Sequence, residues 1–326
     1  MIDPDPDSTQ PFGGHDPETG ILTRLRHWTD VAPVLLLCRV MRMAGSPILV
    51  GSVWAAWVFA AMVLRPVAGE SVLGRSFAFF ILAIIAVPIL AILMRQGALL
   101  TAGRDMASPI EIAGRLIRRP IALLVVLLTV PAAAALFGIV AGGLLWLAGV
   151  VQTSGWGDQV VGQTAIKILS IASVLVVLPA AVLLAGGIAA VPLAIAAMVN
   201  EPDPDPLDSL SRGYEYVARG WLPAIGLALV GAVLVAATLP IGLAISVAAQ
   251  GVIEIVGDAN RQAEQAAIGA LRRLPIAWMT VVGGGVLGGI YLMLRRFTGG
   301  QEIEDIWVPT PPPEVPLPKL RTDGSV

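Results

Sequence analysis

Charged residues are scarce in this sequence, and their scarcity decides the class of protein. Asp, Glu, Lys and Arg make up 13% of the 326 residues, whereas soluble globular proteins carry about 25%. Hydrophobic residues reach 56%, and the mean hydropathy is +0.81. Several continuous apolar stretches exceed the roughly 18 residues that indicate a membrane-spanning helix. Because these stretches are continuous rather than alternating, we predict an all-α, polytopic membrane protein and not a β-barrel.

Cysteine and histidine are almost absent, which excludes several kinds of chemistry. The single cysteine, Cys38, allows neither an intrachain disulfide nor a multi-cysteine metal site. The two histidines, His15 and His27, lie in a polar N-terminal segment, where we interpret them as solvated. The sequence contains no HExxH motif and no phosphate-binding P-loop. We therefore expect no metal, no cofactor and no enzymatic activity.

The net charge of −2, from 21 basic and 23 acidic residues, argues against a nucleic-acid partner. The first 30 residues are polar and rich in Asp and Pro, which is unlike a signal peptide. The expected partners are therefore the lipid bilayer and either another membrane protein or further copies of this chain.

Apolar runs and polar breaks divide the chain into three parts. Residues 1–30 predict a disordered tail, residues 31–296 a membrane domain, and residues 297–326 a proline-rich tail in polyproline II conformation. Within the membrane domain, residues 31–43 predict an interfacial helix, and 151–166 and 250–275 predict polar connections, with a surface helix at 258–274. The six predicted spans are 47–64, 77–94, 121–150, 168–199, 221–249 and 276–294.

Three expectations concern single side chains of the spans. Arg95 and Lys167 lie at span ends, where we expect them to snorkel toward the membrane surface. Trp54 and Trp57 lie deeper than an aromatic belt, which favours helix packing. In the last span, glycines four residues apart predict close helix contact. These helix-packing residues are Gly284, Gly285, Gly288 and Gly289.

The distribution of basic residues predicts the orientation in the membrane. With six spans, one side carries 15 Lys and Arg residues, including those near both termini, and the other side carries 6. The positive-inside rule therefore places both termini in the cytoplasm. The connection 250–275 is the weakest part of this assignment, because it puts Arg261, Arg272 and Arg273 on the outer side.

A short pattern occurs twice, at an offset of 97 residues. Ser108-Pro-Ile-Glu111 begins one copy and Asp205-Pro-Leu-Asp208 begins the other, and an arginine, Arg115 or Arg212, follows four residues after the acidic residue. Ser108 and Asp205 are predicted N-caps, with Glu111 and Asp208 completing capping boxes. The acidic residue and the arginine predict an ion pair between positions i and i+4.

Both copies predict amphipathic helices at the cytoplasmic face, over 108–119 and 205–219, each between two spans. Units 77–150 and 168–249 then form a parallel internal repeat; chance recurrence of a generic capped connection is the alternative. The residues expected to contact headgroups or a partner protein are Arg115, Arg118, Arg119, Arg212, Tyr214, Tyr216 and Arg219.

Three segments carry a resemblance. The run-in Asn200-Glu201, the stretch 207–217 and the exit Ile290-Tyr-Leu-Met-Leu-Arg-Arg296 resemble a group of uncharacterised multi-pass bacterial membrane proteins, over about residues 31–307. The resemblance implies a six-span protein of the bacterial cytoplasmic (inner) membrane and no activity. The unit of span, amphipathic helix and span is more loosely similar to membrane domains that accompany glycerophosphodiester phosphodiesterases. The chain lacks their catalytic domain, so their hydrolysis is not implied here.

Three functions from different classes follow. The first is a membrane scaffold or accessory subunit that engages partners or lipids through its amphipathic helices. The second is a permease or exporter component for a lipid-like or weakly polar solute, with its path between spans 2–3 and 4–5. The third and weakest is an enzyme acting on lipid. Its acid and base groups would have to come from Glu111, Glu201, Asp203, Asp205 and Asp208.

Overall fold

The computed structural model describes residues 32–68, 71–117, 120–202, 204–256, 261–301, 303 and 306. Predictions for the tails at 1–30 and 307–326, and for Arg118, Arg119 and Asp203, lie outside these residues. Helices make up 89% of the described residues, and no strand occurs among them. The helices are η2 (Pro33–Gly45), α2 (Pro47–Ala68), α3 (Val72–Thr101), α4 (Pro109–Ile117), α5 (Pro120–Thr153), α6 (Val160–Asn200), α7 (Pro206–Arg219), α8 (Trp221–Val256), α9 (Arg261–Leu271) and α10 (Leu274–Gly299).

Six of these helices are long and apolar enough to cross a membrane: α2, α3, α5, α6, α8 and α10. Each contains one of the six predicted spans, which confirms the prediction of a multi-pass helical membrane protein. The spanning helices are longer than predicted. The predicted bounds of the polar connection, 151–166, are therefore wrong, and the connection covers only 154–159. Polar side chains here do not break the helices, because the Thr153 and Thr164 hydroxyls donate to carbonyls of their own helix at 3.1 and 2.8 Å.

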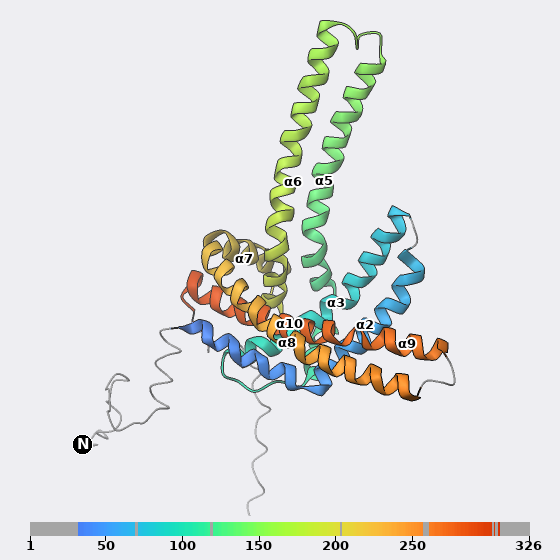
Figure 1. The fold of residues 1–326 in the computed structure, drawn as a ribbon. Coiled ribbons are helices and arrows are strands. Elements are labelled where there is room, and N and C mark those ends of the chain that lie inside the picture. The colour runs from blue at the N-terminus through green and yellow to red at the C-terminus, as the bar shows by residue number, and fades with distance from the viewer. Residues whose placement is uncertain are drawn as a thin grey trace, which may run out of the picture.

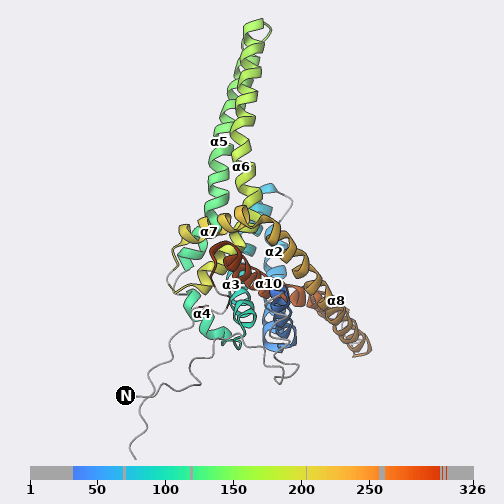
Figure 2. The same cartoon turned by 90° about the vertical axis from the view of Figure 1, so that its left-hand side faces the viewer.

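The helices form three hairpins that diverge from a common base (Figures 1 and 2). The hairpins are α2–α3, α5–α6 and α8 with α9–α10, and the short helices α4 and α7 lie near the base. Helix α10 is the hub of the described structure, since it contacts η2, α2, α3, α6, α7 and α8. The α5–α6 hairpin stands apart, and most of its length projects beyond the other helices (Figure 1).

Glycines of α10 allow it to approach α3 and η2 closely. A Cβ on Gly288 would lie 1.9 Å from the Met94 carbonyl oxygen, and a Cβ on Gly97 would lie equally close, 1.9 Å, to the Gly285 oxygen. A Cβ on Gly284 would lie 2.7 Å from the Leu93 Cβ. All three α10 glycines are buried. The predicted glycine pairs therefore lie where two helix backbones almost touch.

The segment predicted to form an interfacial helix contains helix η2, whose apolar side packs on the core. It is a 3₁₀ helix, in which side chains three residues apart share one face. Leu37, Val40 and Met43 follow this spacing, are fully buried and belong to the core that α10 organises. Arg39 and Arg42 follow the same spacing on the exposed face. The apolar side of this segment is thus covered by protein.

The expected packing of the two tryptophans of α2 is confirmed. The Trp54 indole donates to the Ala270 carbonyl at 2.9 Å, and the Trp57 indole donates to the Thr280 hydroxyl at 3.1 Å. Both tryptophans also pack against the core. These bonds join α2 to the α9–α10 segment, which is more than 200 residues away in sequence.

We expect Gly288→Ala to lower the free energy of unfolding by about 1–3 kcal/mol, because the added Cβ must displace the α3 backbone. Gly283→Ala is the matched control: its Cβ would meet only Val235, at an ordinary 3.7 Å. Alanine favours helix over glycine by about 1 kcal/mol, so this control should be neutral or stabilising. Thermal unfolding in detergent micelles measures both. Equal stability of the two variants would contradict the close contact.

Candidate functional site

The first candidate site is the base of the molecule, where α7 begins. The Asp205 carboxylate accepts hydrogen bonds from the amides of Leu207 and Asp208, at 2.9 and 3.0 Å, which confirms it as the N-cap of α7. At the start of α4, the Ser108 carbonyl accepts a bond from the Ile112 amide at 3.2 Å. Both predicted amphipathic helices therefore begin where the sequence indicates.

The predicted ion pairs are also present. Arg115 pairs with Glu111 at 2.7 Å, and Arg212 pairs with Asp208 at 2.7 Å. A third pair of the same spacing joins Arg219 to Glu215 at 2.7 Å, and the Arg219 side chain is 70% exposed. Exposed pairs of this kind contribute only about 0.2–0.5 kcal/mol each. They orient the side chains of α4 and α7 but do not hold the fold together.

Glu201 forms a stronger polar centre, which the sequence interpretation did not find. One Arg212 nitrogen donates to both of its carboxylate oxygens, at 2.9 and 3.0 Å. The Tyr291 hydroxyl donates to the same carboxylate at 3.0 Å. The Glu201 side chain is only 16% exposed, so these charge-assisted bonds are shielded from water. They connect the end of α6, the middle of α7 and the hub helix α10.

The electrostatic effect of this centre reaches the neighbouring groups of α7. Burial alone would lower the pKa of Arg212, but the carboxylates of Glu201 and Asp208 outweigh it and raise this pKa above its ordinary value. Burial, and then the charge of Glu201, raise the pKa of Tyr216. The Tyr216 ring lies edge-on to the Tyr291 ring, with centroids 6.0 Å apart. Arg212 is therefore a fixed cation and Tyr216 a neutral hydroxyl.

Arg95 does not snorkel, contrary to the sequence prediction. Its side chain is 4% exposed, and a guanidinium nitrogen donates to the Asn200 side-chain oxygen at 3.0 Å. Asn200 is itself fully buried and donates to the Ala196 carbonyl at 2.7 Å. The prediction fails because the end of α6 covers this end of α3, so Arg95 meets protein rather than headgroups. Lys167, in contrast, is exposed.

Of the two tyrosines expected to contact a partner, Tyr216 is buried in the protein and Tyr214 is half-buried. The Tyr214 hydroxyl donates to the Leu183 carbonyl at 2.7 Å, and the Tyr216 residue is 8% exposed. A Cβ on Gly213 would lie 2.4 Å from the Ala190 carbonyl, so α7 lies directly on α6. On α4, by contrast, Ile110 and Ile117 are 83% and 76% exposed. Of the two helices, α4 keeps more of its apolar side free.

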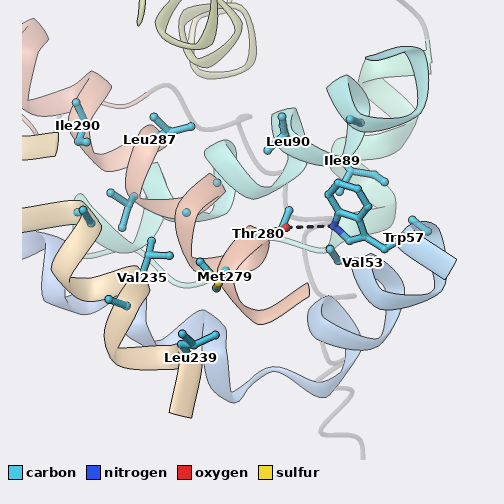
Figure 3. A pocket seen from close by; sticks show the side chains of 18 of the residues that line it. Val53, Trp57, Ile89, Leu90, Val235, Leu239, Met279, Thr280, Leu287 and Ile290 are labelled. Atoms are coloured by element: carbon cyan, nitrogen blue, oxygen red, sulfur yellow. Dashed lines mark hydrogen bonds between the residues drawn. The ribbon is translucent and has the colours of Figure 1, made fainter. Parts of the chain in front are cut away.

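The second candidate site is an apolar cavity of about 740 Å³ between α2, α3, α8 and α10 (Figure 3). Trp57, Ile89, Val235 and Leu287 contribute to a lining that is almost entirely hydrocarbon. Two polar groups at the cavity, the Trp57 indole N–H and the Thr280 hydroxyl, are hydrogen-bonded to each other. The sequence signal for it was small residues on facing helices, which recur at Ala56, Ala60, Ala86, Ala228, Ala232 and Ala236.

This cavity is not the one expected for a permease. The sequence hypothesis placed the path between spans 2–3 and 4–5, whereas the cavity lies between spans 1, 2, 5 and 6. Helices α5 and α6 pack directly on each other along their length. In the part of the chain that the structure describes, no group of three or more His, Cys, Asp or Glu could hold a metal ion.

Comparison of the chain with protein-family models, with curated proteins and with solved structures finds no match.

Replacing Glu201 with glutamine should lower the free energy of unfolding by about 1.5–3 kcal/mol, the usual contribution of hydrogen bonds to a charged group. The amide keeps the shape of the side chain but loses the charge that Arg212 requires. Glu215→Gln is the control, because it removes a carboxylate from an exposed pair, and it should change stability by less than about 0.5 kcal/mol. Thermal unfolding in micelles compares the two variants. Equal effects would argue against a shielded centre at Glu201.

Proposed function

We propose that this chain is a multi-pass membrane protein that holds a lipid-like molecule between its spanning helices and acts as an accessory subunit of a membrane assembly. One observation carries the proposal: the apolar cavity of about 740 Å³ between α2, α3, α8 and α10. This volume falls in the range of about 300–1,000 Å³ that ligand pockets occupy.

The chemistry of the cavity favours an apolar occupant. Water is a poor occupant because the hydrocarbon lining offers it few hydrogen-bond partners. The space is partly open, so an apolar molecule from the surrounding membrane can enter it and cover the lining.

The size of the cavity favours a flexible chain over a partner helix. A helix is about 10 Å wide and needs about 30 Å to cross the hydrocarbon core, hence roughly 2,400 Å³. The cavity is about a third of that. Its alanine-rich walls on α2, α3 and α8 suit an unbranched hydrocarbon chain, which tolerates close backbones.

The setting we propose is the bacterial cytoplasmic membrane, with both termini in the cytoplasm. The excess of basic residues on one side supports this orientation. Helices α4 and α7 would then lie at the cytoplasmic face as a pair of amphipathic elements. The order of long, short and long helix, α3–α4–α5 and again α6–α7–α8, supports a parallel repeat.

A permease or exporter component for a lipid-like solute is the second candidate. The same cavity favours it, since four spanning helices line a partly open space. A fluorescent-lipid translocation assay in vesicles distinguishes the two functions. Translocation by the purified chain alone would favour the permease. A stoichiometric partner in mild-detergent purification, without translocation, would favour the accessory subunit.

Ala232→Phe tests the proposal, because it places a large ring inside the cavity. Native mass spectrometry of the purified chain should detect a retained lipid in the wild type and its loss in this variant. Ala237→Phe, five residues after Ala232 on α8 and outside the lining, is the matched control and should retain the lipid. Equal lipid retention by wild type and Ala232→Phe would contradict the proposal.

A further inference from the structure

The apolar cavity between α2, α3, α8 and α10 has no free hydrogen-bond donor to offer a ligand. Of the described residues that line it, none is charged, and only Trp57 and Thr280 carry a side-chain N–H or O–H group. The Trp57 N–H donates to the Thr280 hydroxyl at 3.1 Å (Figure 3), and this hydroxyl donates to the Ile276 carbonyl at 2.8 Å. The backbone N–H groups of the lining lie inside helices and donate to carbonyls one turn earlier. The donors of these lining residues are thus engaged within the protein.

Two acceptors at the same cavity keep capacity for a further hydrogen bond. A hydroxyl oxygen can accept two hydrogen bonds, and among the described residues only Trp57 donates to the Thr280 oxygen. On helix α8, Pro240 has no N–H, so the carbonyl of Ala236 lacks the donor that position 240 supplies in a regular helix. Ala236 also lines the cavity. The lining therefore offers acceptors without offering donors.

The two acceptors lie at the same end of the cavity. Helices α8 and α10 run antiparallel, and two close approaches show how they are aligned. These approaches are Gly242 to Pro275 and Val235 to Gly283. Ala236 and Thr280 both lie between them in the sequence, so the two acceptors occupy one layer of this helix pair. From this layer to Ile290 on α10, the lining is hydrocarbon.

We infer that the molecule held in this cavity is an uncharged amphiphile with a hydroxyl group, of the class of a long-chain alcohol. The inference rests on the proposed function and narrows it to one class of lipid-like molecule. The ligand hydroxyl donates to Thr280 or to the Ala236 carbonyl, and its hydrocarbon chain lies along the rest of the lining. A carboxylate or phosphate would find no donor in the cavity, and an ammonium group would find no counter-ion. The cost of burying an unpaired charge therefore excludes all three.

Photolabelling of the full-length chain in phosphatidylcholine nanodiscs tests the inference. Three probes share a hexadecyl chain with a diazirine and differ at one end, which carries a hydroxyl, an ionised carboxylate or a methyl ester. The reference is labelling of α6 near Ile168 and Ile171, whose exposed side chains report the concentration of each probe in the bilayer. Relative to this reference, the alcohol should label the cavity-lining peptides of α8 and α10 at least about tenfold more than the carboxylate does.

The methyl ester separates the need for a donor from the exclusion of charge, because it is uncharged and has no O–H. The alcohol should label the cavity about threefold more than the ester does, the effect of a typical hydrogen bond inside a membrane protein. An anionic probe and a donor-free probe are thus both expected to lose to the alcohol, for different reasons.

Two variants remove the acceptors. Thr280→Val keeps the shape of the side chain without its oxygen, and Pro240→Ala supplies an N–H that engages the Ala236 carbonyl. The advantage of the alcohol over the ester should vanish when the two substitutions are combined. Thr280→Ser keeps the hydroxyl, is the matched control and should preserve the advantage. A general loss of structure would lower the labelling of the cavity by alcohol and ester alike.

The outcomes distinguish this inference from the proposed function. Failure of all three probes to label the cavity above the α6 reference would overturn both. Equal labelling by the alcohol and the ester, or by the alcohol and the carboxylate, would overturn the inference and leave the proposed function standing. An advantage of the alcohol over the ester that survives the combined variant would do the same, because the hydroxyl would then bind elsewhere.

Discussion

The structure depends on the close approach of α10 to α3 and η2. Burial of apolar surface does not drive helix association within a bilayer, because lipid tails are as apolar as leucine; contact at short range does. Glycine makes that contact possible at Gly284, Gly285 and Gly288, where any side chain would meet Leu93, Met43 or the Met94 carbonyl. Helix α10 contacts η2, α2, α3, α6, α7 and α8, and its most extensive contacts are with α3 and α8.

The same side of α10 continues from packing into polar chemistry. Gly284, Gly288, Tyr291 and Arg295 follow one another at intervals of four, three and four residues, which keeps them on one helical stripe. The first two contact α3, and Tyr291 binds Glu201 at the end of α6. The position of α10 against α3, which the glycines allow, therefore determines whether the Tyr291 hydroxyl reaches the Glu201 carboxylate. Packing in the apolar layer and the geometry of the base are consequences of one helix position.

Local features of this fold could be predicted from sequence, and distant pairings could not. The spans, the Asp205 cap and the ion pairs of Arg115 and Arg212 each depend on residues within a few positions of one another. The Glu201 centre joins residues 90 positions apart, and the Arg95–Asn200 bond joins residues 105 apart. Hydropathy treats each helix as alone in lipid. It therefore assigned Arg95 to the membrane surface, although another helix end covers it.

A long apolar run can also contain parts of one helix that differ in burial. Helix α6 has 41 residues, hence a length of roughly 60 Å, about twice the hydrocarbon core. Its end, from Leu193 to Met198, is buried by other parts of the protein, whereas large apolar side chains nearer its start, such as Ile168 and Ile171, are exposed.

The two amphipathic helices, α7 and α4, also differ in how much of their apolar side the protein buries. Helix α7 packs part of its apolar face, including Leu210 and Tyr216, against the rest of the protein. Helix α4 has one buried residue, Ile112, and leaves Ile110 and Ile117 exposed, while Arg115 lines a cavity of about 320 Å³ at the base of the molecule. The duplicated pattern in the sequence therefore encodes two unequal elements. Helix α7 mainly braces the base of the molecule, whereas helix α4 leaves more of its apolar side exposed.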